Sequence, residues 1–413
     1  MKYVGIDLHK KSISLCVVNK ARKVLDRQRF LCQDVERIES YFADLGSFEF
    51  VVEATATYEW LVQLLEPLAD SWVLANPGKM RVIAESAKKT DKLDAKTLAE
   101  FLALGMIPQS YRPTARGREH RVLVRYRVSC RQRVSRLKCQ IRHMAASYNA
   151  DRPDLFEAER LEELRQRKDM TNADRFVLGE RLKEYEESLV HLSEAESALE
   201  SFGKECGESE RRSREVLRSA PGVGPVVCEV VLAELGDVSR FGSIKEATSY
   251  AGLVPKNRES AGKSKELGIT KSGSRVLRWA MVEASWQAVQ HSTRWCSVYE
   301  QLKHRRGGKR AIIAVARRLL GVLVSMLRSG EKYRWSLSEL RYREMKAEKR
   351  KEKRRLAKEA KEAKEAKGAK GAKEGSSPKT PRRSGSSAAS PTKRSKPTKT
   401  GKSPKMSQAT VGV

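Results

Sequence analysis

Residues 3–30 read YVGIDLHKKSISLCVVNKARKVLDRQRF, and this stretch decides the fold of the N-terminal part of the chain. Its apolar residues form three short runs separated by polar residues suited to turns, which is typical of consecutive β-strands joined by hairpins. Two more apolar runs follow, with helical spacing between and after them. The pattern predicts five strands: Tyr3–His9, Ser12–Asn19, Lys23–Phe30, Phe48–Thr55 and Ser71–Pro77.

The order of these elements narrows the fold class. Three hairpin-linked strands, then helix, strand, helix, strand and helix, is the order of the RNase H-like fold, whereas the periodicity alone establishes only a mixed α/β domain. We therefore predict an α/β RNase H-like (RuvC-like) domain over residues 1–113.

The rest of the chain is expected to be mainly helical. From about Thr114 to Phe202, apolar residues recur at spacings of three and four, which predicts a helical hairpin or coiled coil over residues 114–205. A compact, mainly α domain follows over 206–340, and a disordered basic tail over 341–413. The apolar positions of the two helices are Leu123, Tyr126, Cys130, Val134, Leu137, Ile141 and Met144, then Leu178, Leu182, Tyr185, Leu189 and Leu192.

The charge of the chain predicts a polyanionic partner. The formal net charge is +31, and residues 346–413 carry 22 Lys and Arg against 6 Asp and Glu, so about half of the excess lies outside the tail. Nucleic acid is the expected partner of so basic a chain. The seven cysteines and six histidines show no zinc-ligand spacing, and no apolar run approaches the ~20 residues of a membrane span. We expect a cytoplasmic, nucleoid-associated protein with reduced thiols.

Four carboxylates occupy places where an RNase H-like domain would bring them together. Asp7 lies in the first strand and Glu53 at the end of the fourth, while Asp91 and Asp94 lie three residues apart at a helix start. Clustered carboxylates repel one another unless divalent cations lie between them, so the set predicts a Mg²⁺ site that acts on phosphodiester oxygens. The alternative is that Asp91 and Asp94 only favour a helix N-terminus, and that Asp7 and Glu53 are ordinary strand-end residues.

Two groups of residues are candidates for nucleic-acid contact. Arg127 and Arg131 lie among the basic residues of the first long helix, although such a row can also be a solvated face. Gly222 and Gly224, in Ala220-Pro221-Gly222-Val223-Gly224-Pro225, resemble the hairpin of a helix-hairpin-helix element, in which backbone N–H groups approach a phosphate. An ordinary turn between helices is the alternative.

Ser260 is a candidate nucleophile in a segment that composition alone would describe as a flexible basic loop. It lies between small residues, and a hydroxyl with cations around it could attack a phosphodiester. The neighbouring cations are Lys256, Arg258, Lys263 and Lys271, and the segment from Gly268 to Arg275 is expected to open a helix.

Together these motifs resemble one family, the bridge-RNA-guided transposases of the insertion-sequence one-ten group, to which the Piv-type DNA invertases are related. The resemblance extends over roughly residues 1–335. It is carried by Gly5-Ile6-Asp7, Val52-Glu53-Ala54-Thr55, Lys89-Thr90-Asp91-Lys92-Leu93-Asp94-Ala95, Pro221-Gly222-Val223-Gly224, Gly252-Leu253-Val254-Pro255, Ser260-Ala261-Gly262 and Ile269-Thr270-Lys271-Ser272-Gly273.

The resemblance implies a RuvC-like DEDD domain, a coiled-coil connection and a helical transposase domain. It implies that Asp7, Glu53, Asp91 and Asp94 bind Mg²⁺, and that Ser260 forms a covalent phosphoserine intermediate in DNA strand exchange. It also implies a noncoding guide RNA that pairs with donor and target DNA, and a homo-oligomer, dimer or tetramer, whose protomers share a composite site.

The chain departs from the family pattern in two places. The usual Ser-Ser-Gly or Gln-Ser-Gly reads Glu-Ser-Ala-Gly here, which leaves Ser264, Ser272 and Ser274 as alternative nucleophiles, and the tail after Met345 lies outside the pattern.

Two other functions stay open at this point. The carboxylates alone would suit a metal-dependent, structure-specific RuvC-like nuclease without a covalent intermediate, and the fold alone would suit a non-catalytic DNA- or RNA-binding protein.

Overall fold

The computed structural model describes the backbone of residues 1–55, 57–83, 91–260 and 263–374. Within these ranges it describes the side chains of all residues except 81–94, 257–266, 350, 353, 357, 358 and 360–374. The chain divides into two units after Arg343, and each unit is described by itself.

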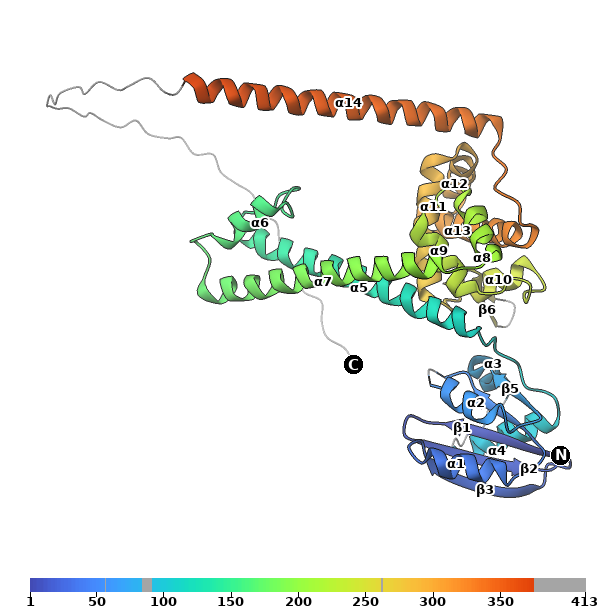
Figure 1. The fold of residues 1–413 in the computed structure, drawn as a ribbon. Helices are drawn as coiled ribbons and strands as arrows, with labels where there is room; N and C mark the ends of the chain where they lie inside the picture. The colour runs from blue at the N-terminus through green and yellow to red at the C-terminus, as the bar shows by residue number, and fades with distance from the viewer. Residues whose placement is uncertain (56, 84–90, 261–262, 375–413) are drawn as a thin grey trace, which may run out of the picture. The chain divides into compact units, whose positions relative to one another are not determined.

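The N-terminal residues form a five-stranded mixed sheet with the strand order β3-β2-β1-β4-β5 (Figure 1). β1 pairs with β2, and β2 with β3, in antiparallel fashion, whereas β4 runs parallel to both β1 and β5. The strands are β1 (Lys2–Leu8), β2 (Ser12–Val18), β3 (Val24–Leu31), β4 (Phe48–Glu53) and β5 (Ser71–Ala75). All five predicted strands are thus present, with ends that differ from the prediction by no more than two residues.

Helices supply apolar contacts to both faces of this sheet. One face packs against α1 (Val35–Ala43) and α2 (Glu59–Leu65) around large side chains such as Phe48 and Phe50. The other face contacts α4 (Asp91–Ala103), which crosses β1 and β2 through small residues. α3 (Pro77–Ile83) follows β5. The bulky face stabilises the domain, and the small-residue face lets a helix approach the strand backbones closely.

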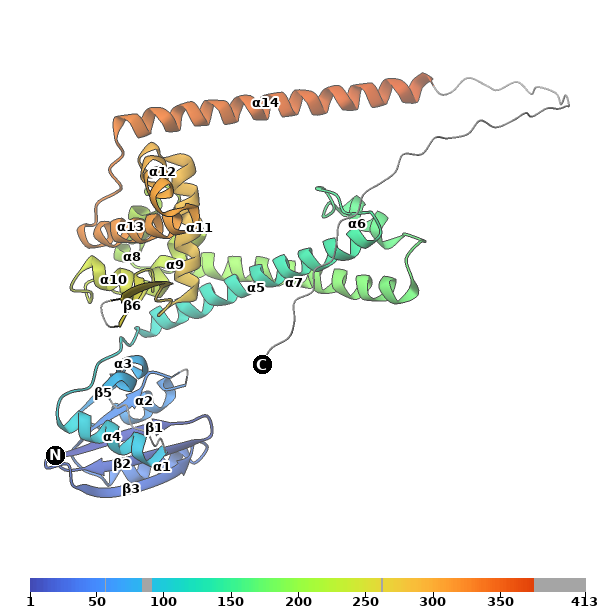
Figure 2. The ribbon, with the colours of Figure 1, turned by 180° about the vertical axis from the view of Figure 1, so that it is seen from behind.

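Two long helices, α5 (Ala115–Ser147) and α7 (Asn172–Lys204), lie side by side over much of their length (Figures 1 and 2). The short helix α6 (Ala158–Arg165) lies between them in sequence. α5 begins after Thr114, whose hydroxyl oxygen accepts a hydrogen bond from the Gly117 amide at 3.1 Å. A Thr N-cap of this kind satisfies one of the free N–H groups at a helix start.

The apolar seam between α5 and α7 differs in part from the predicted one. Leu137, Ile141, Leu178 and Leu182 are buried in it as expected. Tyr126 and Leu189, however, are 46% and 39% exposed. Ser188 is buried beside Leu189, whereas Val124 and Val128, near Tyr126, are buried in the core of the C-terminal helical region. Both candidate positions in each stretch fit helical spacing, so only the tertiary packing decides which one faces the partner helix.

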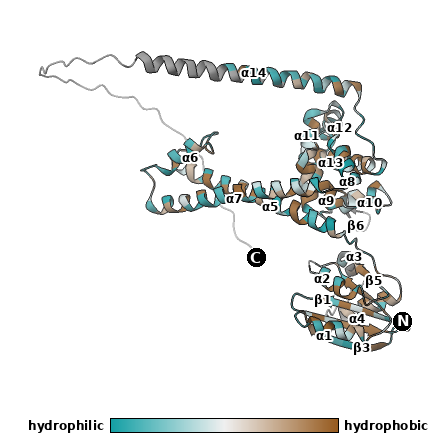
Figure 3. Ribbon diagram, in the orientation of Figure 1, coloured by the Kyte–Doolittle hydropathy of each residue, from teal (hydrophilic) through white to brown (hydrophobic). Residues whose placement is uncertain are grey.

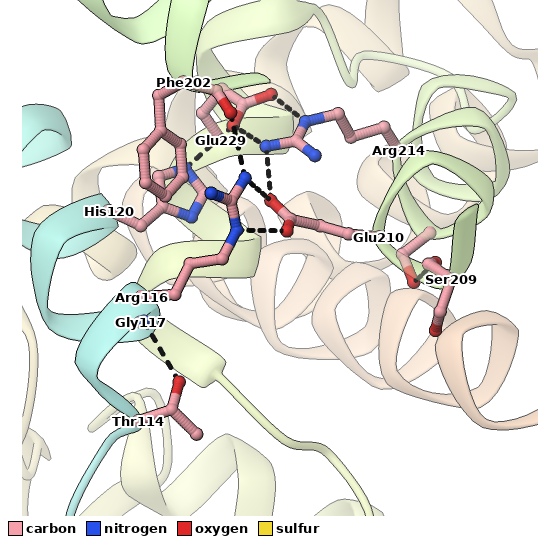
Figure 4. Close-up of polar contacts among 10 residues, drawn as sticks. Thr114, Arg116, Gly117, His120, Phe202, Ser209, Glu210, Arg214 and Glu229 are labelled. Carbon is pink, nitrogen blue, oxygen red and sulfur yellow. Dashed lines mark hydrogen bonds and ion pairs between the residues drawn. The ribbon is translucent and has the colours of Figure 1, made fainter. Parts of the chain in front are cut away.

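A network of ion pairs joins α5 to α8 (Glu208–Arg218) and α9 (Pro225–Leu235) (Figure 4). Arg214 of α8 contacts both Glu210 and Glu229 at 2.8 Å, and His120 of α5 lies 2.8 Å from Glu229. Arg116 contacts the other side of Glu210 at 2.8 Å. Burial opposes the ionisation of Glu229, but the hydrogen bonds from His120 and Arg214 outweigh it, so the pKa of Glu229 lies below its ordinary value.

The C-terminal helical region is built around α13 (Gly308–Ser329), whose buried residues run along most of its length. Figure 3 shows hydrophobic residues gathered on this helix and on the strands of the N-terminal sheet. The region also holds a two-stranded hairpin of β6 (Pro255–Ser260) and β7 (Lys263–Ile269). The other helices are α10 (Ile244–Tyr250), α11 (Arg275–His291) and α12 (Thr293–Arg306).

The last described element is α14 (Leu337–Glu374). The sequence predicts a disordered tail over 341–413 in which the Lys/Glu/Ala-rich stretch Lys358–Lys373 could be transiently helical, and the part that the structure describes, to Glu374, is helical. Lys, Glu and Ala are strong helix formers, and Arg355 pairs with Glu352 at 2.8 Å one turn away. None of the helices in the described ranges contains an apolar stretch long enough to cross a membrane.

Candidate active site

The ends of β1 and β4 bring two of the predicted carboxylates together. These strands are parallel neighbours whose last registered pair is Ile6 with Val52, so Asp7 and Glu53 are the next residues on each strand. Adjacent strands lie about 4.8 Å apart, and residues at matching positions of a parallel pair face the same side of the sheet. Asp7 and Glu53 therefore lie next to each other at one edge, and both are partly buried.

Two residues that the sequence analysis did not single out as site residues lie beside these carboxylates. His9 Nε2 lies 3.1 Å from Asp7 Oδ2, and the His9 side chain is 43% exposed. Thr55 follows Glu53 by two residues, and its buried Oγ1 has no hydrogen-bond partner among the residues that the structure describes. The i, i+2 spacing along an extended chain, which places alternate residues on one face, was the signal that could have found His9. Thr55 instead follows a tight turn in which its amide donates to the Glu53 carbonyl at 2.8 Å, and no local pattern marks it.

The third and fourth carboxylates belong to α4. A Cβ on Gly5 would lie 2.1 Å from the Ala95 carbonyl oxygen and 2.4 Å from the Ala99 nitrogen, so the helix rests directly on β1 at this glycine. α4 begins at Asp91, and Asp94 immediately precedes Ala95, which places both backbones near β1. The side chains of Asp91 and Asp94 lie outside the described residues, so their contacts stay a prediction.

The donors at this edge suit a hard divalent cation. Carboxylate and hydroxyl oxygens are the ligands that Mg²⁺ prefers, and the buried Thr55 hydroxyl lacks a partner in the described part of the chain. Among the side chains that the structure describes, no three His, Cys, Asp or Glu form a metal-binding group. The predicted quartet lies outside that test, because two of its four side chains are not described.

Ser260 is the last residue of β6, and its backbone pairs with that of Lys263 at the start of β7. The predicted flexible loop is therefore an antiparallel hairpin whose strands are joined across residues 261–262. Charged residues are poor strand formers by propensity, so the backbone ladder that pairs Arg258 with Lys265 was not visible in the sequence. The side chain of Ser260 lies outside the described residues, as do those of Arg258 and Lys263.

Two glycines lie at the base of this hairpin, at positions where any side chain would clash with the backbone of another segment. Gly252 has φ +67°, and a Cβ there would lie 2.0 Å from the Ser272 carbonyl oxygen. Gly273 has φ +81°, and a Cβ there would lie 1.8 Å from the Tyr250 carbonyl oxygen. The Lys271 amide donates to the Gly252 carbonyl at 3.2 Å. The two motif segments that flank β6 and β7 thus clamp each other through their backbones.

Arg278 completes this clamp. Its Nη1 donates to the carbonyl oxygens of Ala251, Ser272 and Gly273 at 3.3, 3.1 and 3.0 Å. Ser274 caps the following helix α11, as its hydroxyl accepts from the Leu277 amide at 3.1 Å. The helix predicted to open within Gly268–Arg275 thus begins at Arg275, whereas Gly268 and Ile269 belong to β7. Arg278 was missed because nothing in the local pattern shows that its guanidinium reaches three carbonyls of other segments.

The predicted phosphate-binding glycines have distinct surroundings. A Cβ on Gly222, whose φ is +81°, would lie 2.1 Å from the Ala284 carbonyl oxygen of α11, so this residue permits a close helix contact. Gly224 is the N-cap of α9 and is exposed, with nothing within 4 Å of its added Cβ. A turn between α8 and α9 is therefore present, and nucleic-acid contact by either glycine stays a prediction.

The basic residues predicted to contact nucleic acid also differ in how exposed their side chains are. The Arg127 side chain is 13% exposed and donates from Nε to Glu196 of α7 at 3.0 Å, which accounts for it as a bridge between the two long helices. Arg131, Lys256 and Lys271 are exposed. Lys271 also has φ +56°, an uncommon conformation for a residue with a side chain, at the base of the hairpin.

Comparison with known proteins identifies both parts of the chain. A DEDD-domain family model described as "Transposase" matches residues 4–149, and a model described as "Transposase IS116/IS110/IS902 family" matches residues 214–300. The chain belongs to this transposase family. The first match spans Asp7 and Glu53, and the second spans the hairpin whose first strand, β6, ends at Ser260. Transposases of this family catalyse DNA strand transfer, and a DEDD domain implies dependence on a divalent metal ion.

Several curated proteins resemble this transposase along most of its length. The transposase for insertion sequence element IS1111A of Coxiella burnetii is 24% identical, over 81% of this chain and 92% of its own. The transposase for IS1328 of Yersinia enterocolitica is 24% identical, over 68% and 82%. The pilin gene-inverting protein of Moraxella bovis is 21% identical, over 80% and 97%.

Proposed function

We propose that the protein recombines the DNA of an insertion sequence with a metal-binding carboxylate cluster and a serine nucleophile. The observation that carries the proposal is the register of β1 and β4, which aligns Asp7 with Glu53 at the edge of the sheet where α4 rests on Gly5. The strand order and the parallel central pair support an RNase H-like, RuvC-like fold for this domain.

In this proposal Asp7, Glu53, Asp91 and Asp94 would hold Mg²⁺, which supplies Lewis-acid stabilisation of the charge on a phosphodiester oxygen. The strands fix the first two carboxylates, and α4 brings the backbones of the other two close to β1. His9 contacts Asp7 and orients its carboxylate. Because Gly5 permits the close helix approach, the spacing between the strand carboxylates and the helix depends on that residue.

Ser260 would attack the phosphorus of the scissile phosphodiester with its hydroxyl oxygen. The bond from phosphorus to one deoxyribose oxygen breaks, the serine proton is released, and the departing strand end takes up a proton as a free hydroxyl. A hydroxyl of another strand then attacks the phosphoserine, which restores both the serine and a phosphodiester. The position of Ser260 as the last residue of β6 supports this role, because the hairpin that β6 forms with β7 has a clamped base.

The proposal extends to partners. Relatives of this chain are named as insertion-sequence transposases and as a gene-inverting protein, which supports element ends and a target as its DNA substrates. We include a noncoding guide RNA that selects the sites, and a homo-oligomer, dimer or tetramer, whose protomers share a composite site. A cytoplasmic, nucleoid-associated location follows from a DNA substrate.

Strand exchange in the presence of Mg²⁺ tests the proposal. Asp7→Ala and Ser260→Ala are each expected to abolish exchange while nucleic-acid binding is largely retained, and Ser264→Ala is the matched control that keeps activity. Normal exchange by either of the first two variants would contradict the proposal. Metal-dependent cleavage that needs Asp7 but not Ser260 would instead indicate a RuvC-like nuclease.

A further inference from the structure

A large basic groove lies in the C-terminal helical region and contains none of the residues proposed for catalysis. Its volume is about 1060 Å³, and it is lined by parts of α10, α12 and α13 and by the segment after α13. Eight Lys and Arg side chains line it, against a single carboxylate, that of Glu331. Six of these cations are Lys245, Arg294, Arg305, Arg306, Arg317 and Arg318.

Most of the groove's positive charge is not neutralised from within the protein. Glu331 already pairs with Arg334 at 2.7 Å, and Lys332 contacts Glu215 at 3.6 Å. In the part of the chain that the structure describes, Lys245, Arg305, Arg306, Arg317 and Arg318 form no ion pair. Like charges held this close repel one another, so an anionic ligand would lower the free energy of the folded region.

The packing of the helices builds the groove. Gly321 of α13 lets α10 approach, since a Cβ there would lie 2.8 Å from the Ile244 side chain. Arg317 and Arg318 precede Gly321 by about one turn and so lie near this contact. Arg305 and Arg306 are exposed at the end of α12. Cations from three helices therefore converge on one hollow, whose lining also includes the apolar side chain of Val322.

We propose that this groove binds the sugar-phosphate backbone of a nucleic acid. Arginine predominates in the lining, and its planar guanidinium can hold a phosphate through two hydrogen bonds. Each strand of a duplex carries one phosphate about every 3.4 Å, so a backbone offers the repeated charges that several separate cations require. The choice of nucleic acid rests on the proposed function, and the groove adds a binding surface to it.

Salt-dependent binding by the full chain tests this inference. Affinity for a 30-bp DNA duplex and for an RNA hairpin would be measured by fluorescence anisotropy, in EDTA, over a range of KCl concentrations. The groove variant is Arg305→Gln/Arg306→Gln. The matched control is Lys20→Gln/Lys23→Gln, which removes the same charge from exposed positions in the turn between β2 and β3.

The groove variant is expected to flatten the slope of log affinity against log salt by about 1.8 for duplex DNA if both arginines contact its phosphates, and to flatten the slope for the RNA hairpin if RNA is the ligand. The control should keep the wild-type slope. Flattening with the duplex alone identifies DNA as the ligand, and flattening with the hairpin alone identifies RNA. Wild-type slopes for both probes would overturn the inference.

A second variant protects the test against misfolding. If Arg305→Gln/Arg306→Gln melts early, Lys245→Gln/Arg318→Gln changes two other exposed groove cations on different helices and carries the same expectation. EDTA removes strand cleavage from the measurement, so failure of the proposed chemistry leaves the result unchanged. Unchanged slopes in a variant that still exchanges strands would refute the groove and leave the proposed function standing.

Discussion

Gly5→Ala tests how closely α4 is held against β1 beside the strand carboxylates. The new methyl group would lie 2.1 Å from the Ala95 carbonyl oxygen, whereas ordinary contact begins at 3.4 Å. Because β1 is hydrogen-bonded on both sides in the sheet, α4 must retreat, by about 1.3 Å if the movement is directed along this contact. Overpacking of this kind costs about 1–3 kcal/mol of the free energy of unfolding.

The same movement carries Asp91 and Asp94 away from Asp7. A misplacement of about 1 Å in a catalytic constellation can lower the rate on the order of 100-fold. We therefore expect Gly5→Ala to lose about two orders of magnitude in strand exchange at a temperature where the variant is still folded. Thermal melting by circular dichroism and a gel assay of strand exchange measure the two effects separately.

Gly179→Ala provides the control for this prediction. Gly179 lies in α7 with nothing within 4 Å of an added Cβ, so the variant should be as active as the wild type and up to about 1 kcal/mol more stable. Wild-type strand exchange by Gly5→Ala, at an unchanged melting temperature, would refute the claim that the approach of α4 to β1 positions the site.

Three further predictions concern the hairpin, the ion-pair network and the tail. Gly252→Ala places a methyl group 2.0 Å from the Ser272 carbonyl oxygen and should lower both the melting temperature and strand exchange. Gly268→Ala is the control: its added Cβ has open space, so it should lower the free energy of unfolding by only about 1–2 kcal/mol, the cost of a left-handed backbone for a residue with a side chain. The pKa of Glu229 is lower in the folded state, so its ionised form stabilises the protein above pH 4.5, and this contribution is lost as the pH falls through the folded pKa. The difference in melting temperature between the wild type and Glu229→Gln should therefore shrink on acidification. A constant difference would contradict this. A chain that ends at Met345 should retain strand exchange while its non-specific DNA affinity falls at low salt, and loss of exchange at every salt concentration would show that the tail is needed.

The strands and the first two carboxylates were predictable because their signals are local. Short apolar runs separated by turn residues define β1, β2 and β4, and a carboxylate within such a run stands out from its neighbours. Asp7 and Glu53 therefore lie where the sequence predicts them, at the ends of adjacent strands. The same local reasoning placed a helix opening within Gly268–Arg275, and α11 begins at Arg275.

Other features depend on contacts between distant segments. The glycines at 5, 222, 252 and 273 each make room for a backbone that is far away in the sequence, so their role in packing was not visible. The exposure of Tyr126 follows from which face of α5 meets α7. The β6–β7 hairpin relies on backbone pairing between charged strands, and Arg127 faces Glu196 of another helix instead of solvent.

The central claim, that Ser260 forms a covalent bond to DNA, is tested most directly by trapping. The purified protein would be incubated with the DNA ends of its element, the flanking noncoding RNA and Mg²⁺, then denatured and examined for a protein-DNA adduct. The proposal predicts an adduct in the wild type that is absent from Ser260→Ala. An adduct that persists in Ser260→Ala, or DNA cleavage that needs Asp7 yet leaves no adduct in the wild type, would contradict it.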